Sequence, residues 1–98
     1  MARFSVHMMP GGGRVVNLQS DFLDWLDTRL VAPLTPLEQG PPPAKHLNPV
    51  FTLEGARFTL IIQSMAAVPT SALGGVVADL SAQQDEITRA LDTVFQGF

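Results

Sequence analysis

The last stretch of the chain, residues 78–98, has the apolar pattern of one amphipathic helix. Apolar residues recur there at intervals of three and four, the spacing that lines one helix face, and they are Ile87, Ala90, Leu91, Val94 and Phe95. Ser81 and Gln84 form a capping-box pattern, so we predict that the helix begins near Ala82. Gly97 stands where a left-handed C-terminal cap is expected. Phe98 then either folds back onto the core or faces a partner, and its terminal position favours the first.

The N-terminal segment has the alternating pattern of a half-buried strand. Phe4, Val6 and Met8 fall on one side of residues 3–9, and polar residues fall on the other. Residues 10–13 contain three successive glycines, which predict a turn, and residues 14–18 resume the apolar pattern. We therefore expect a hairpin. A phosphate-binding loop is disfavoured because no strand-to-helix context and no lysine follow the glycines.

Residues 48–53 and 56–63 form the clearest predicted hairpin, with a turn at Glu54 and Gly55. One face of the second strand carries the large apolar residues Phe58, Leu60 and Ile62. Ile61 points the other way, so part of this strand is expected to be covered on both sides. We therefore place it at the centre of the sheet.

The remaining segments are shorter or interrupted by proline and glycine. Residues 29–34 predict a strand that ends at Pro33, and residues 65–68 predict a short strand stopped by proline. Residues 19–21 interrupt the second strand, and residues 22–26 fit either one helical turn or an irregular loop, of which we favour the loop. Residues 36–43, which hold four prolines, are expected to be a surface loop. Together these patterns predict one α+β domain over residues 1–98. It would have five or six short antiparallel strands and a C-terminal helix, arranged as a small barrel or a twisted sheet with the helix against it.

Composition narrows the class of protein. The chain has 98 residues, 46% of them hydrophobic, and no apolar run approaches the roughly 20 residues of a membrane-spanning helix, so we expect no membrane segment. We expect no signal peptide either, because residues 1–9 alternate and do not form an apolar block. There are no cysteines, which fits a reducing cytoplasm. The net charge is −3, and the six basic residues are spread singly along the chain. Direct nucleic-acid binding is therefore not expected.

Candidate chemistry is sparse. His7 and His46 have no partners at metal-ligand spacing, and each is expected at the surface or half-buried. Carboxylates recur every three residues at Asp21, Asp24 and Asp27, which suggests either a hard-cation site or, more commonly, a solvated acidic face. The serines lack a nucleophile-elbow motif. Trp25 is expected to be a core anchor first and an interface residue second. We therefore predict no catalytic residues, no metal and no cofactor.

In order, the residues resemble the CcdB toxin family, the toxin half of a bacterial toxin–antitoxin pair. The matching positions are Gln19-Ser20-Asp21, Arg29, Val31, Pro33, Leu34, Met65-Ala66, Val68-Pro69, Val77-Ala78-Asp79-Leu80-Ser81, Asp85 or Glu86, Ile87, Ala90, Phe95 and Gly97. The proline-rich insert at residues 38–45, followed by Leu47-Asn48-Pro49-Val50, is similar to the chromosomal branch of the family.

The resemblance implies an SH3-like antiparallel barrel of five to seven short strands with a C-terminal helix. It also implies a two-fold homodimer in the cytoplasm that binds the A subunit of DNA gyrase and traps the enzyme with its DNA cleaved. A cognate CcdA-like antitoxin, folding from disorder on the dimer, would be the second partner. The implied gyrase-facing residues are Gln96, Gly97 and Phe98, with Asp92 and the loop residues Ser20, Phe22, Leu23 and Asp24.

The chain departs from the family at its end. The best-studied members end in Trp-Gly-Ile, whereas this chain has Gln96 at the tryptophan position and Phe98 at the last. One alternative is thus a weak or inactive member that dimerises and binds an antitoxin without poisoning gyrase. Another is a MazF-like endoribonuclease on the same barrel, using Arg29 with Ser20 or His46, although no basic groove for RNA is evident.

Overall fold

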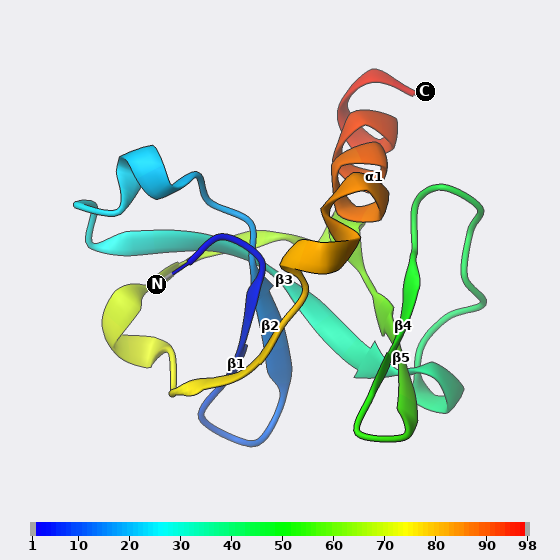
Figure 1. Ribbon diagram of the computed structural model, residues 1–98, viewed down its shortest axis with the longest axis horizontal. Coiled ribbons are helices and arrows are strands. Elements are labelled where there is room, and N and C mark those ends of the chain that lie inside the picture. The colour runs from blue at the N-terminus through cyan, green and yellow to red at the C-terminus, as the bar shows by residue number, and fades with distance from the viewer. Residues whose placement is uncertain (1, 98) are drawn as a thin grey trace.

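A curled antiparallel sheet, crossed at one end by a single helix, accounts for most of the chain (Figure 1). The structure is a computed structural model, and it describes residues 2–97. The strands are β1 (Ser5–Met8), β2 (Arg14–Asn17), β3 (Thr28–Pro36), β4 (Val50–Leu53), β5 (Ala56–Leu60), β6 (Ala66–Pro69) and β7 (Val76–Asp79). Helix α1 (Gln84–Gln96) follows. The α+β class and the curled small-barrel form with a C-terminal helix are confirmed.

The longest strand, β3, is the centre of the sheet. The strand order is β4-β5-β3-β2-β1-β7, and β6 also pairs with β3. Both predicted hairpins are confirmed, with Val6 opposite Val16 and Phe51 opposite Phe58. The expectation that the second hairpin is central was wrong. Strand β3 has nine residues, which is long enough for β6 and β5 to pair one after the other along the same edge. Strands β4 and β5 are too short to pair with two strands on one edge.

Strand β3 also continues through Pro33, where we had predicted its end. It pairs with β6 over Thr28 to Val31 and with β5 over Leu34 to Pro36. Pro33 therefore lies at the break between the two partners. It needs no amide N–H there, and its carbonyl accepts a hydrogen bond from the Ile61 amide at 2.9 Å.

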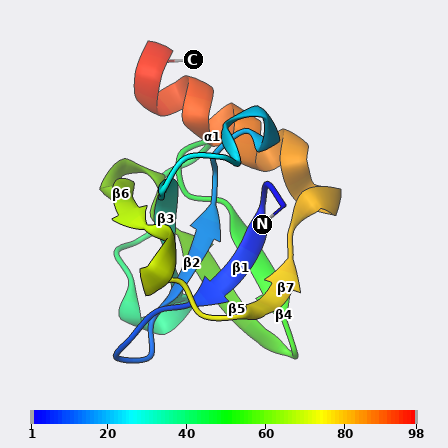
Figure 2. The same ribbon diagram turned by 90° about the vertical axis from the view of Figure 1, so that its left-hand side faces the viewer.

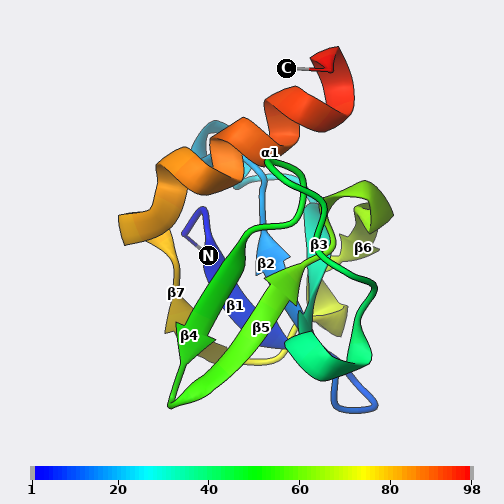
Figure 3. The ribbon, with the colours of Figure 1, turned by 90° about the vertical axis from the view of Figure 1, so that its right-hand side faces the viewer.

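The hydrophobic core lies between the concave face of the sheet and α1, which crosses the ends of the strands (Figure 3). Its fully buried members include Val6, Val16, Leu60, Ile62, Leu80, Ile87 and Ala90. The predicted apolar face of β5 is confirmed, and Thr59 and Ile61 are buried on the other face as well. The helix is thus attached through Ile87 and Ala90, with Leu91 and Val94 packed at the edge.

The start of the helix differs from the prediction, whereas its end agrees. Residues Ser81–Gln83 form a 3₁₀ turn, and α1 begins at Gln84 without a side-chain cap. The predicted capping box is absent because this turn places Gln83, and not Ser81, at the N-cap of α1. The Ser81 amide instead bonds to the Asp79 carboxylate at 2.8 Å. Gly97 has φ of 81° and its amide bonds to the Thr93 carbonyl, so the left-handed cap is confirmed.

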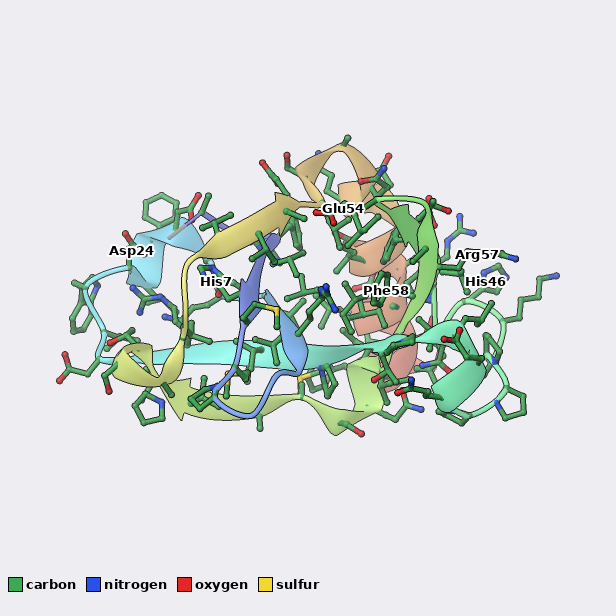
Figure 4. All side chains as sticks on the ribbon, turned by 90° about the horizontal axis from the view of Figure 1, so that it is seen from below. His7, Asp24, His46, Glu54, Arg57 and Phe58 are labelled. Atoms are coloured by element: carbon green, nitrogen blue, oxygen red, sulfur yellow. The ribbon has the colours of Figure 1, made fainter. Side chains whose placement is uncertain are left out.

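Two further expectations on the N-terminal half of the sheet were wrong. The stretch that we assigned to the amphipathic pattern started at residue 78, but β7 extends to Asp79 because it pairs with β1, placing Ala78 opposite Val6. His7 is buried, since the loop before β7 folds over it (Figure 4). Its Nδ1 donates to the Gly74 carbonyl at 2.8 Å, and its Nε2 lies 2.8 Å from the Ser5 hydroxyl.

We expect Thr59→Val to stabilise the fold. Thr59 is fully buried, and its hydroxyl has no hydrogen-bond partner among the described residues. Replacing an unsatisfied hydroxyl by a methyl group of similar size should add about 1 kcal/mol to the free energy of unfolding, or about 4 to 8 °C in Tm. Calorimetry measures this shift, and Thr52→Val, at an exposed position of β4, is the matched control. A lower Tm would mean that the hydroxyl is bonded to water.

Candidate functional site

Large apolar side chains stand in solvent on one loop, residues 20–28, which we call the exposed loop. Phe22 is 92% exposed, Trp25 is 76% exposed and Leu23 is also exposed. The prediction that Trp25 anchors the core was therefore wrong. The loop extends beyond the sheet between β2 and β3, where no core lies within reach, and its 3₁₀ turn at Asp21–Leu23 buries no residue.

The Arg29 guanidinium holds this loop from beneath. Its Nη1 donates to the carbonyls of Leu26 and Thr28 at 2.7 and 2.8 Å. Its Nη2 donates to the Asp24 carbonyl at 2.8 Å and to the Asp24 carboxylate at 3.0 Å. Arg29 itself is only 5% exposed. One buried cation thus fixes the backbone on both sides of Trp25.

Gln19 and Ser20 hold the other parts of the loop. The Gln19 side-chain amide donates to the carbonyls of Leu23 and Thr28 at 3.0 and 3.1 Å, and its oxygen accepts the Leu30 amide. Ser20 caps the 3₁₀ turn by accepting the Phe22 amide at 3.2 Å. Ser20 therefore supports the loop, and the side chains that it presents are those of Phe22 and Leu23.

The exposed loop is thus strongly hydrogen-bonded and yet leaves its apolar side chains in water. Ordering a loop costs conformational entropy, and burial of these side chains does not offset that cost within the chain. Rigid, exposed aromatic residues bind a partner with little further loss of entropy. The arrangement is typical of a protein-binding surface.

The end of α1 is a second exposed segment. Asp92, Gln96 and Gly97 are exposed, as the resemblance implies, and Phe98 lies outside the described residues. Phe95 is 70% exposed, although its spacing predicted a place on the buried helix face. The helix projects beyond the sheet at this end, so its last turn is covered only on the side where Val94 packs against the core (Figures 1 and 3).

These two segments lie at the same end of the sheet but not side by side. Figure 2 shows the exposed loop level with α1, and Figure 1 shows it on the opposite side of the molecule from the helix terminus. Neither segment carries a basic residue, since residues 20–28 contain none and the last turn of α1 has none. The sequence-predicted residues therefore lie in two separate, partly apolar segments of one chain.

The residues of the ribonuclease alternative are not brought together. Arg29 is committed to the exposed loop and bonds Asp24, whereas His46 lies at the opposite end of the molecule (Figure 4). There, Arg89 Nη1 lies 3.4 Å from His46 Nδ1, above a hollow of about 290 Å³ that these two residues line with Pro49, Asp85 and Glu86. Both terminal nitrogens of Arg29 bond the loop and its Nε is buried, so none of them is in position to meet a phosphodiester.

Two searches of the described residues concern metal ligands and membrane-spanning helices. No cluster of three or more His, Asp or Glu side chains in residues 2–97 has the geometry to hold a metal ion. Of the carboxylates that recur every three residues, Asp24 is instead paired with Arg29. No helix within the same range is long and apolar enough to cross a membrane.

Comparison with known families agrees with this architecture. The family model described as CcdB protein matches residues 3–97, which is nearly the whole chain and includes both exposed segments apart from Phe98. The match covers β1 at one end and the Gly97 cap at the other. The chain therefore belongs to the CcdB family, and it is a CcdB-like protein of a toxin–antitoxin system.

Proposed function

We propose that this protein is a toxin that binds the A subunit of DNA gyrase and traps the gyrase–DNA cleavage complex. The rigid exposed loop is the observation that supports this most, because it presents apolar side chains at positions that the family resemblance assigns to gyrase contact. Poisoning by binding requires no catalytic group, so the proposed toxin is not an enzyme. Its proposed place of action is the cytoplasm, where gyrase works.

A two-fold homodimer is part of the proposal. The exposed loop and the end of α1 are at the same end of the sheet but apart in one chain (Figure 2). A two-fold axis near the helix would bring both copies of each segment to one composite surface. In the same proposal, a CcdA-like antitoxin that folds on binding neutralises the dimer.

Expression in a bacterial host without the antitoxin tests the proposed function. Growth should stop, and gyrase isolated from these cells should be attached to cleaved DNA. Normal growth without cleaved DNA would contradict poisoning. If the purified protein still bound its antitoxin in that case, the chain would be an inactive member of the family. Incubation with RNA tests the ribonuclease alternative, and cleavage of RNA would favour it.

We expect Gln96→Trp to strengthen gyrase binding about tenfold or more. Gln96 is exposed and has no ring, whereas an indole at this position could stack on a cationic side chain of the partner. Titration calorimetry with the full-length A subunit of gyrase measures the change. Gln84→Trp, exposed at the other end of α1, is the matched control.

We also expect Phe98→Ala to abolish toxicity.

An unchanged affinity of Gln96→Trp, with wild-type binding measurable, would show that the helix end is not an anchor. The proposed function would then depend on the exposed loop alone.

A further inference from the structure

We propose that Trp25 is the aromatic anchor of partner binding, and that its indole face receives an arginine or lysine side chain from a basic protein surface. This inference rests on the proposed function and takes that partner to be the A subunit of gyrase. It adds Trp25, which is not among the gyrase-facing residues that the resemblance implies, and it predicts a positively charged surface on the partner.

Trp25 is presented for contact by its surroundings. The ring is 76% exposed, and the carbonyls on either side of it, those of Asp24 and Leu26, both accept hydrogen bonds from Arg29. The backbone at Trp25 is therefore held in place before any partner arrives. Phe22, 92% exposed on the same loop, extends the apolar area. Tryptophan in such a position is the side chain most enriched in binding hot spots.

Charge decides which partner this surface fits. Arg29 neutralises the Asp24 carboxylate at 3.0 Å, whereas Asp27 is exposed and has no basic side chain beside it in the loop. Asp21 accepts the Arg3 backbone amide at 3.0 Å. The loop thus holds three carboxylates and no basic residue of its own, and Arg29 offsets one of the three, so its surplus charge is negative. A negatively charged loop that carries an exposed indole favours a cation at the ring face.

The same charges disfavour a second copy of this chain as the occupant. Two exposed loops placed face to face would bring their carboxylates together, without a basic residue in residues 20–28 to offset the repulsion. A basic surface on a different protein is therefore the complement.

The indole also supplies what the helix end lacks. Gln96 offers no ring, and Trp25 is the single tryptophan of the chain. The largest aromatic contact to a cation would thus come from the loop and not from the end of α1. Tryptophan gives the strongest cation–π attraction of the aromatic side chains, which favours Trp25 over Phe22 and Phe95 for this contact.

Three substitutions of Trp25 separate a cationic contact from simple apolar burial. The affinity for the full-length A subunit of gyrase is measured at low and at high salt, with the oligomeric state checked by sedimentation. Trp25→Ala and Trp25→Leu should weaken binding about 30-fold or more, whereas Trp25→Phe, which keeps a ring, should stay within about tenfold of wild type. Asp27→Asn should weaken binding a few-fold and reduce its salt dependence. Val76→Ala, at a 59% exposed position on β7, is the control and should bind as wild type does.

If Trp25→Leu binds as tightly as wild type, the cationic contact is overturned. If Trp25→Ala binds as tightly as wild type, Trp25 is not an anchor at all. The proposed function stands in both cases. Dissociation of a dimer by Trp25→Ala would show that the ring covers a second copy, which also overturns the proposal. If the wild-type chain fails to bind the A subunit of gyrase in both salt conditions, the proposed function and this inference fall together.

Discussion

Arg29→Met should release the exposed loop and lower the free energy of unfolding by about 2 to 4 kcal/mol. Methionine keeps most of the aliphatic bulk but donates none of the bonds that Arg29 makes to the carbonyls of Asp24, Leu26 and Thr28. The Arg29 Nε is already buried without a partner in residues 2–97, so its removal offsets part of the loss. Urea unfolding followed by circular dichroism measures the change.

The order of the loop can be measured separately, because Trp25 is the single tryptophan and lies between two of the carbonyls that Arg29 holds. Its fluorescence anisotropy should fall in Arg29→Met, and gyrase binding should weaken with it. Arg29→Lys is the matched control, since it keeps the charge but loses the planar fork, and its anisotropy should lie between the two. Unchanged anisotropy in Arg29→Met would mean that Gln19 and Ser20 alone fix the loop.

Ile87→Ala should cost about 3 kcal/mol of stability and detach α1 from the sheet before the rest of the protein unfolds. Ile87 is fully buried, and with Ala90 it is one of two helix residues that are. A loss of this size is a large fraction of the roughly 5 to 15 kcal/mol that typically stabilises a domain. Because the helix carries the proposed gyrase-facing end, toxicity should be lost as well.

Thr88→Ala is the control for this change, since Thr88 is the exposed neighbour on the same helix. Alanine is the better helix former, so this variant should be as stable as wild type or slightly more stable. If Ile87→Ala unfolds within about 1 kcal/mol of wild type, the helix is held mainly by contacts at Leu91 and Val94.

Local pattern was sufficient to predict both hairpins, the apolar face of β5 and the Gly97 cap, because alternation and turn residues act over a few positions. It failed where distant segments decide the outcome. Pro33 stays in a strand only because β6 ends and β5 begins opposite it. Val76 and Val77 form a strand only because β1 lies beside them.

The candidate site was predicted in part. The loop residues and the helix end emerged from the family resemblance, but Trp25 and Phe95 were assigned to the core by their apolar character. A local signal was present at Trp25, since Asp24 and Asp27 flank it and carboxylates in series predict a solvated segment. The clamp by Arg29 could not be predicted, because it depends on carbonyl groups, which every residue has.

The pairing of β1 with β7 joins segments that are far apart in the sequence, with Val6 opposite Ala78 and the Leu80 amide bonded to the Phe4 carbonyl at 2.9 Å. Contacts between residues so far apart in sequence give a fold a high contact order, and closing so long a loop is slow. Helix α1 follows directly after β7, so its position depends on that closure. The end of α1 that is proposed to face gyrase therefore takes its place only once β1 and β7 have paired.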